Sequence, residues 1–494
     1  MKKLETDIVV ISAGTAGLAA AVAAAENGAR VIAFEKAAVT GGTGNMGMGP
    51  LAVESHIQKV KNVNLSREQA FNIFMEYTHW RVDARLVSEY INKSASTIEW
   101  LEDMGVEFLD AIAYVKGSNF THHIVKGASG RSGPQASAVI MKCMTERASE
   151  LGVKIYLQTP VKKIHKENGR ITGVTAEDKN GETIEVKAKA VIVASGGFGD
   201  NPEWIKKYTG YEWGKDLFSI RIPGLVGDGI RMAWEVGAGA EGMNMELTGG
   251  MPMRSIEENQ KAILTGAVAA LSVFSQPNLL VNLHGERFMN EEAAGNPTFA
   301  GNAFARQPKR CGFKIFDESI ANDYEKNGFD WLNVMMPMAK VKNLVNQLVE
   351  ASKENEHIFV ANSLDELASK TGINPVGLKK TVEEYNKTCE NGRDRIFHKN
   401  ATYLKPIKQP RFFAGRNFPS AYGSLGGIKI NWKTEVVTQE QEVIPGLYAA
   451  GVDANAIYAD SYVFTLPGNT MGFALNSGRM AGENAADYAK SLGK

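Results

Sequence analysis

The order of apolar and polar residues near the start of the chain predicts a strand, a turn, a helix and a second strand. Ile8 to Ile11 is a β-branched run typical of a strand buried on both faces. The alanine-rich stretch from Leu18 to Asn27 predicts a helix that ends at Gly28. Arg30 to Phe34 predicts the second strand. Together they form a βαβ unit over residues 6–36.

The turn inside this unit has the residues that a dinucleotide needs. Gly14 and Gly17 occupy the second and third glycine positions of the G-x-G-x-x-G pattern, at the start of the helix. Ser12 replaces the first glycine, and we expect it to make the turn with a negative φ. Glu35 closes the second strand, where an acid accepts hydrogen bonds from an unphosphorylated ribose. The pattern therefore predicts FAD or NAD rather than NADP.

The first residues also resemble a secretory signal, with Lys2 and Lys3 before an apolar run. Glu5 and Asp7 interrupt that pattern, and cleavage after the alanines would destroy the βαβ unit. We therefore expect no targeting segment, no membrane contact and a cytoplasmic location.

Composition restricts the remaining possibilities. The chain has 494 residues, 44% of them hydrophobic, and a formal net charge of zero. This length suits two domains, and the charge balance argues against nucleic acid as a partner. Three scattered cysteines indicate buried thiols in a reducing compartment, and the eight histidines have no metal-ligand spacing, so no metal is expected. The neighbouring His122 and His123 are interpreted as two polar loop residues.

Further along the chain, turns and helices follow recognisable patterns. Asn168-Gly169 and Asn180-Gly181 predict hairpins. Asp228 is placed to cap a helix, and Trp80 and Trp100 are expected to anchor helix packing. Residues 240–355 change character and are rich in methionine. The fold predicted is α/β, with a Rossmann-type parallel sheet in a cofactor domain made of residues 1–239 and 356–494, and an inserted α+β capping domain of residues 240–355.

These motifs, taken in order, resemble the flavoprotein superfamily of fumarate reductase and succinate dehydrogenase, which includes ketosteroid dehydrogenases and other C=C reductases. The resemblance covers nearly the whole chain. It is carried by Ser12 to Gly17 with Glu35-Lys36, Gly41-Gly42, Ala194 to Phe198, Gly227 to Ile230, Gly285 to Glu291, Ser424 to Gly427, Pro445 to Gly451 and Leu466 to Asn469.

The resemblance implies non-covalent FAD, because the loop of residues 41–50 has no histidine to tether it. It also implies a set of cofactor contacts, several of which follow strands of the predicted sheet. The expected FAD contacts are Ser12, Gly14, Thr15, Ala16, Gly17, Glu35, Lys36, Gly41, Gly42, Thr43, Val161, Ser195, Gly196, Asp228, Gly451, Val452, Gly468 and Met471.

The substrate positions differ from those of fumarate reductases. The family's two histidines and two arginines for dicarboxylates align with Met251, Gly423, the stretch 296–298 and Thr465. A buried dicarboxylate without counter-ions costs several kcal/mol, so fumarate and succinate are rejected. We expect instead an uncharged, bulky substrate such as a steroid, an isoflavonoid or an aryl enone. The expected substrate contacts are Met251, Met253, Arg254 and Thr465.

The predicted reaction is hydride transfer at flavin N5 to or from a C=C bond conjugated to a carbonyl, with Tyr422, Tyr462 and Tyr458 as candidate proton donors. NADH or another donor would supply electrons. Three alternatives stay open: a flavoprotein subunit that passes electrons to a partner, a fumarate-reductase-like enzyme for another small enoate, and a flavoprotein that has lost catalysis. The oligomeric state is not predicted.

Overall fold

The computed structural model describes residues 1–219, 222–249, 270–331 and 340–493. The chain forms two compact units: unit 1 consists of residues 1–210, 221–246 and 423–494, and unit 2 of residues 211–220 and 247–422. The boundaries fall within strands β12 (Ala240–Thr248) and β17 (Ser420–Ile428). Unit 1 is therefore built from both ends of the chain.

The main sheet of unit 1 has the strand order β18-β19-β10-β2-β3-β6. Its strands are β2 (Ile8–Ile11), β3 (Val31–Phe34), β6 (Lys154–Tyr156), β10 (Ala190–Val193), β18 (Glu435–Val437) and β19 (Val443–Ala449). Pairing is parallel from β19 to β6, and β18 at the edge is antiparallel. The strands β2, β3 and β10 are fully buried, which explains their continuous apolar sequences. The predicted α/β fold with a parallel sheet is confirmed.

A second sheet of unit 1 has the order β1-β9-β8-β7. Its strands are β1 (Lys2–Glu5), β7 (Val161–Glu167), β8 (Arg170–Glu177) and β9 (Thr183–Lys187). Asn168 and Gly169, between β7 and β8, have φ angles of 49° and 82°, as a two-residue hairpin requires. The sequence pattern missed β1, because this strand is largely exposed and shows no apolar alternation.

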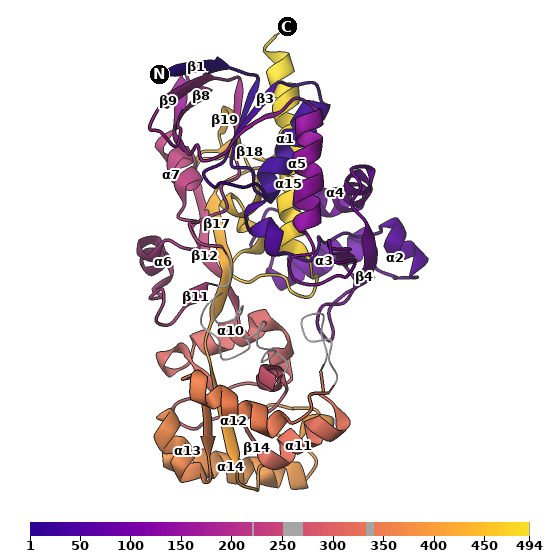
Figure 1. Cartoon of the computed structure of the whole chain (residues 1–494), viewed down its shortest axis with the longest axis vertical. Helices are drawn as coiled ribbons and strands as arrows, with labels where there is room; N and C mark the ends of the chain where they lie inside the picture. Colours follow the sequence, from indigo (N-terminus) through magenta and orange to yellow (C-terminus); the bar gives the residue numbers. More distant parts are fainter. Residues whose placement is uncertain (220–221, 250–269, 332–339, 494) are drawn as a thin grey trace. The chain divides into compact units, whose positions relative to one another are not determined.

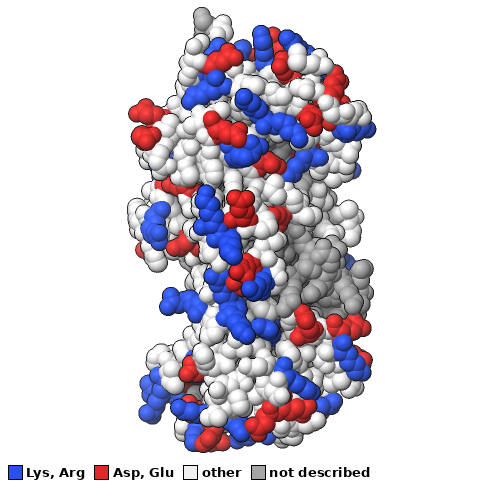
Figure 2. Space-filling view, turned by 90° about the vertical axis from the view of Figure 1, so that its left-hand side faces the viewer, with Lys and Arg blue, Asp and Glu red and all other residues white. Residues whose placement is uncertain are grey.

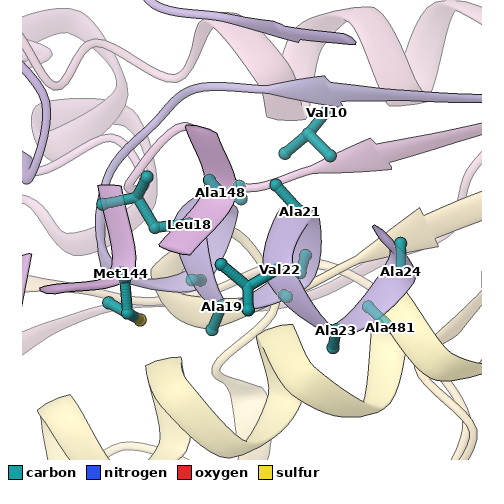
Figure 3. Close-up of a cluster of buried hydrophobic side chains, with 14 of the residues drawn as sticks. Val10, Leu18, Ala19, Ala21, Val22, Ala23, Ala24, Met144, Ala148 and Ala481 are labelled. Carbon is teal, nitrogen blue, oxygen red and sulfur yellow. The ribbon is translucent and has the colours of Figure 1, made fainter. Parts of the chain in front are cut away.

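Three helices of unit 1, α1 (Thr15–Glu26), α5 (Ala138–Glu150) and α15 (Asn469–Ser491), lie side by side (Figure 1). Helix α1 is mostly alanine and almost entirely buried, so its neighbours approach closely. Figure 3 shows Leu18 and Val22 of α1 with Met144 of α5 and Ala481 of α15. A Cβ atom on Gly478 of α15 would lie 2.3 Å from the carbonyl oxygen of Ala16, so glycine is required at this contact.

The other elements of unit 1 are helices α2 (His56–Val60), α3 (Arg67–Tyr77), α4 (Ala84–Asp103), α6 (Pro202–Thr209) and α7 (Asp228–Glu235), and the hairpin of β4 (Phe108–Ile112) and β5 (His122–Val125). Trp100 of α4 is buried, as expected. The prediction for Trp80 is wrong, since its side chain is 61% exposed. Trp80 follows the end of α3 and has a φ of 57°.

Unit 2 contains an antiparallel sheet with the order β13-β14-β16-β15. Its strands are β13 (Leu279–Val281), β14 (Gly312–Asp317), β15 (Ile358–Ala361) and β16 (Phe412–Asn417), with the two-residue β11 (Phe218–Ser219) beside β17. Its helices are α10 (Pro297–Ala305), α11 (Glu318–Asn327), α12 (Leu344–Glu354), α13 (Leu364–Thr371) and α14 (Pro375–Glu390). Because β16 pairs with both β14 and β15, residues 356–422 belong to unit 2, whereas the sequence placed them in the cofactor domain.

The interior of unit 2 holds a buried ion cluster of Arg287, Glu291, Asp394 and Lys399. Arg287 binds both oxygens of Glu291 at 2.8 Å and Asp394 Oδ2 at 2.7 Å. Lys399 Nζ lies 3.7 Å from Glu291 Oε2 and donates a hydrogen bond to the Tyr385 hydroxyl at 2.7 Å. Burial opposes the charge of Arg287, but the hydrogen bonds that it donates to the two carboxylates outweigh this and raise its pKa. Each charge in the cluster therefore has an opposite charge beside it.

The surface shown in Figure 2 carries interspersed basic and acidic side chains, in line with a formal net charge of zero. Within the described residues, no helix is both long enough and apolar enough to cross a bilayer. No group of histidine, cysteine or acidic side chains in this part of the chain is arranged to hold a metal ion.

Candidate functional site

The predicted cofactor residues collect at the carboxyl ends of neighbouring parallel strands in unit 1. Strands β19, β10, β2 and β3 are adjacent in the main sheet. The turns that follow them contain Gly451 and Val452, Ser195 and Gly196, Ser12 to Gly17, and Glu35 and Lys36. Ligands of open α/β sheets bind at this edge. The fold therefore brings together residues that lie more than 400 positions apart in the chain, such as Ser12 and Val452.

Ser12 has a φ of 87°, so the expectation of a negative φ is wrong. This left-handed conformation costs a non-glycine residue about 1–2 kcal/mol. Two hydrogen bonds compensate: Ser12 Oγ donates to Glu35 Oε2 at 2.9 Å and accepts from the Gly14 N–H at 3.2 Å. At Gly17 a Cβ atom would lie 2.0 Å from the Ser12 carbonyl oxygen. The turn therefore keeps the shape of the glycine motif with a serine in its first position.

Gly14 indicates where a ligand would approach. Its φ of −75° suits any residue, and a Cβ atom there would have only Ser12 Oγ nearby, at 3.5 Å. Neither strain nor packing among the described residues explains a glycine. Helix α1 begins after Gly14 with no side-chain cap and no acidic residue in its first turn. Free N–H groups at a helix start attract anions, so this turn fits the pyrophosphate of FAD.

Glu35 is buried and its carboxylate is held in one orientation. Oε2 accepts hydrogen bonds from Ser12 Oγ and from the Ala13 N–H at 2.8 Å, and Oε1 accepts one from the Ala37 N–H at 2.8 Å. An ionised carboxylate offers about four acceptor positions, so about one remains for a ribose hydroxyl. Glu35 thus fits the predicted ribose contact.

The glycine-rich segment after β3 packs against this turn. Gly41 has a φ of 98° and precedes the 3-10 helix η1 (Gly42–Met46), which contains Thr43. The Gly41 N–H donates to the Ala13 carbonyl at 2.8 Å, and Gly14 and Gly41 form an isolated bridge. The structure therefore places Gly41, Gly42 and Thr43 beside the start of α1.

The turn after β10 encloses a carboxylate that sequence reasoning missed. Asp453 is fully buried and accepts hydrogen bonds from the Ser195 N–H, from Ser195 Oγ at 3.1 Å, from the Gly196 N–H at 3.3 Å and from the Gly197 N–H at 2.8 Å. Burial raises the pKa of Asp453, and these hydrogen bonds act in the opposite direction. The residue ties the end of β19 to the end of β10. An acid directly after Gly451-Val452 was the available signal in the sequence.

Lys36 and Asp228 form an ion pair with an Nζ to Oδ2 distance of 3.0 Å, and Lys36 also donates to the Gly224 carbonyl. Asp228 is the first residue of α7, and the N-cap is Gly227 without a side-chain hydrogen bond, so the capping prediction is wrong. Both side chains are more than a third exposed, so the pair contributes little to stability. Val161 is buried at the start of β7.

The start of α15 gathers the remaining predicted residues of unit 1. Gly468 is the N-cap of this helix and has a φ of 86°. Met471 packs against the glycine-rich segment, because a Cβ atom on Gly47 would lie 2.5 Å from Met471 Cε. The Thr470 N–H donates to the Tyr462 hydroxyl oxygen at 2.8 Å. Thr470 Oγ1 donates to Glu246 Oε1 at 3.1 Å. Glu246 is a buried acid in β12 that the sequence analysis missed, although an acid between Met245 and Leu247 interrupts an apolar stretch.

Tyr458 and Tyr422 have different surroundings. Tyr458 is fully buried, and its hydroxyl donates to the Asn469 carbonyl at 3.0 Å. Burial raises its pKa well above the ordinary value. Tyr422 belongs to unit 2 and is 37% exposed. The predicted substrate contacts Met251, Met253 and Arg254 lie outside the described residues.

His122 and His123 do not lie in a loop, so that interpretation is wrong. Both are buried in β5, which pairs with β4. His123 Nε2 lies 2.6 Å from Ser55 Oγ and its Nδ1 lies 2.9 Å from the Thr121 carbonyl oxygen. The following Ile124-Val125 gave the signal for a strand. The side chains diverge as expected for neighbours, but both point into buried surroundings.

The comparisons with known sequences agree with this geometry. Residues 7–470 match the family model described as FAD binding domain. A vinyl phenol reductase of Lactiplantibacillus plantarum is 34% identical over 489 residues, which cover 98% of this chain and 96% of that protein. An NADH:fumarate oxidoreductase of Klebsiella pneumoniae is 28% identical over 98% of this chain, which spans about half of that protein (48%).

The comparison with solved structures gives the same fold. The structure of the open conformation of a flavocytochrome c3 fumarate reductase matches with a TM-score of 0.72 and 26% identity. The match covers 98% of this chain and 79% of that chain. The predicted resemblance to fumarate reductase flavoproteins is therefore confirmed.

Proposed function

We propose that this chain, which belongs to the FAD binding domain family within the fumarate reductase and succinate dehydrogenase superfamily, reduces the C=C bond of an uncharged aryl alkene. It is an FAD-dependent oxidoreductase acting on carbon–carbon double bonds. The observation that carries the substrate class is the nearly end-to-end match with a protein named vinyl phenol reductase. The substrate proposed is an alkene conjugated to a hydroxyphenyl ring.

The charges at the aligned substrate positions support an uncharged molecule. Met251, Gly423 and Thr465 are neutral where the family resemblance implies basic residues. At the fourth position, Asn296 is engaged as the cap of α10, where its side chain accepts from the Thr298 N–H at 3.0 Å. Burying a carboxylate without a counter-ion costs several kcal/mol, so these positions disfavour fumarate.

The residues of unit 1 are assigned roles in holding the cofactor. The start of α1 receives the pyrophosphate beside Gly14, and Glu35 accepts a hydrogen bond from a ribose hydroxyl. Bound FAD supplies a two-electron hydride carrier. Reduction of the alkene then needs one proton, which a side chain must hold near the second carbon.

We assign to Tyr462 the role of the general acid that donates this proton, and Tyr422 is the second candidate for the same role. The Tyr462 oxygen lies at the start of α15, where it accepts the Thr470 N–H. Tyr458 has a packing role, because its hydroxyl donates to the Asn469 carbonyl and its ring is stacked on Phe74, with ring centroids 5.8 Å apart. Removing a general acid slows a reaction by about 10²- to 10⁴-fold.

The electron donor is a separate molecule, NADH or a redox protein. NADH appears in the name of the Klebsiella relative, of which this chain spans about half (48%). Anaerobic mixing of the oxidised enzyme with NADH tests this part of the proposal by the loss of flavin absorbance.

The reaction is tested on the FAD-loaded enzyme, photoreduced without oxygen and mixed with 4-vinylphenol or with fumarate in a stopped-flow instrument. We expect 4-vinylphenol to reoxidise the flavin and to yield 4-ethylphenol in equal amount, while fumarate reacts at least about 100-fold more slowly. Tyr462→Phe should slow reoxidation, and Tyr458→Phe is the matched control. Faster reoxidation by fumarate, or by a protein partner alone, contradicts the proposal.

A further inference from the structure

Several buried polar atoms in unit 1 have no hydrogen-bond partner among the described residues, and two of them lie on neighbouring segments. These two are Nδ1 of His122, whose side chain is 4% exposed, and Oγ1 of Thr465. Leaving such an atom unsatisfied costs about 1–3 kcal/mol. Nearly all buried polar groups in proteins are paired, so an unpaired one requires an explanation, such as an absent ligand.

The two atoms belong to one neighbourhood. The N–H and the side-chain amide of Asn119 both donate to the Thr465 carbonyl, at 2.9 and 3.0 Å. Two residues further along, Thr121 Oγ1 donates to the Pro467 carbonyl at 3.0 Å. Residues 119–122 therefore run beside residues 465–467. The Tyr114 ring joins the two ends, with its centroid 5.7 Å from that of His122 and 5.2 Å from that of Phe464.

This neighbourhood is continuous with the residues assigned to the cofactor. His122 forms an isolated bridge with Leu51, and the His123 N–H donates to the Pro50 carbonyl at 2.9 Å. The Leu51 N–H donates in turn to the carbonyl of Gly468, the N-cap of α15, at 2.8 Å. Leu51 directly follows the glycine-rich segment of residues 41–50. A ligand bound beside the flavin is thus within reach of these elements.

His122 differs from its neighbour in one respect that matters. His123 has partners for both ring nitrogens, Ser55 and the Thr121 carbonyl, so its role is structural. Both histidines are buried in β5, and burial lowers the pKa of each to about 4. The His122 ring has a hydrogen bond with the Gly49 backbone, which acts against the lowering of its pKa, but its Nδ1 has no partner among the described residues. His123 therefore serves as a matched control.

The chemistry of the pair selects a neutral, polar ligand group. A neutral imidazole nitrogen accepts a hydrogen bond, and a threonine hydroxyl donates one. A phenolic hydroxyl donates and accepts at the same oxygen, so it satisfies both atoms. A carboxylate has no proton to donate to Nδ1 and would be buried here without a counter-ion.

We propose that His122 Nδ1 and Thr465 Oγ1 together bind the phenolic hydroxyl of the substrate, with the hydroxyl donating to His122 and accepting from Thr465. This inference rests on the proposed function, because it names the group by which that substrate is recognised. The assignment makes His122 a specificity residue. It distinguishes hydroxylated aryl alkenes from styrene-like ones that lack the hydroxyl.

The test measures binding to the oxidised, FAD-loaded enzyme, followed by the change in flavin absorbance. The probes are 4-ethylphenol and ethylbenzene, which differ by the hydroxyl group. We expect the wild-type protein to prefer 4-ethylphenol, and His122→Phe to weaken 4-ethylphenol about tenfold or more while changing ethylbenzene less than about threefold. Thr465→Val, which removes the hydroxyl at nearly constant volume, should act in the same direction.

The controls separate recognition from folding and from catalysis. His123→Gln should lower thermal stability and leave the ratio of the two affinities unchanged. The assignment is overturned if His122→Phe weakens the binding of both probes equally. It is also overturned if the ratio of the two affinities is unchanged in both His122→Phe and Thr465→Val. The binding test involves no turnover. If the variants change the ratio of the two affinities as expected but the enzyme does not reduce 4-vinylphenol, only the proposed reaction is contradicted.

Discussion

Two buried regions, the ion cluster of unit 2 and the surroundings of His122 and Thr465 in unit 1, contain different kinds of polar groups. In unit 2, the buried ion cluster pairs Arg287 with Glu291 and Asp394, at 2.7–2.8 Å. In unit 1, His122 Nδ1 and Thr465 Oγ1 belong to neutral side chains and have no partner among the described residues. The paired charges are explained by the fold alone, whereas we attribute the two unpaired neutral atoms to the proposed substrate. The difference separates residues that hold the structure from residues that recognise a substrate.

The largest effect should come from breaking the ion cluster. Arg287→Met leaves Glu291 and Asp394 buried without their counter-ion, and we expect a loss of about 3–5 kcal/mol in unfolding free energy. The control is Arg231→Met, which removes an exposed pair with Glu235 on α7 and should cost less than about 1 kcal/mol. Denaturant titration of both variants measures the difference. Equal midpoints would show that the cluster has no structural role.

Acid should affect the two units in different pH ranges. The folded pKa of His122 is about 4, below its ordinary 6.5, so the unfolded chain binds more protons and stability falls as the pH drops from 6.5 to 4. One such histidine loses up to about 3 kcal/mol at pH 4.

The ion cluster responds only at lower pH. Burial opposes ionisation of Asp394, but hydrogen bonds from Arg287 outweigh this and lower its pKa from 3.8 to about 2. Its contribution is therefore lost as the pH falls below 3.8. Between pH 6.5 and 4 the unfolding free energy of the wild type should fall more steeply than that of His122→Phe, and parallel curves would contradict the pKa assignment.

Asp453 presents an intermediate case, a buried carboxylate held by neutral donors. In Asp453→Asn an NH2 group replaces one carboxylate oxygen, so either the N–H groups of Ser195 and Gly196 or the N–H group of Gly197 lose their acceptor. We expect a loss of about 1–3 kcal/mol in stability and weaker FAD retention on dilution. Unchanged FAD dissociation would show that this turn does not position the cofactor.

Ser12 should give the smallest net effect. Ser12→Ala keeps the strained φ of 87° and loses both hydrogen bonds, for an expected cost of about 1–2 kcal/mol. Ser12→Gly loses the same hydrogen bonds but relieves the strain, so we expect a change within about 0.5–1 kcal/mol of zero. Thermal melts of the two variants measure this difference. If Ser12→Gly is less stable than Ser12→Ala, the backbone of Ser12 is not strained.

The local parts of the fold could be predicted from the sequence. The strand at Ile8–Ile11 and the start of α1 follow from β-branched and small residues that are neighbours in the chain. The φ of Ser12 could not be predicted, because a hydrogen bond to Glu35, 23 residues away, stabilises it. Asp453 was missed for the same reason, since its partner Ser195 is 258 residues distant.

The extent of unit 2 and the role of His122 also depend on distant contacts. Strand β16 joins unit 2 through pairing with β14, about 100 residues earlier, which no local pattern reveals. From the sequence, His122 is interpreted as a polar loop residue, because the side chains of adjacent residues diverge in regular structure and do not form a metal site. Its role becomes visible only in the fold, where His122 Nδ1 has no partner while the ring of His123 is hydrogen-bonded.

The central claim is that unpaired neutral atoms beside the cofactor turns mark the place of an uncharged, hydroxylated substrate. Crystals of the FAD-loaded protein soaked with 4-ethylphenol test it most directly. The account predicts that the phenolic oxygen lies within hydrogen-bond distance, about 2.6–3.2 Å, of His122 Nδ1 and Thr465 Oγ1. A phenol bound at the flavin with its hydroxyl directed elsewhere, and both atoms still unpaired, would contradict it.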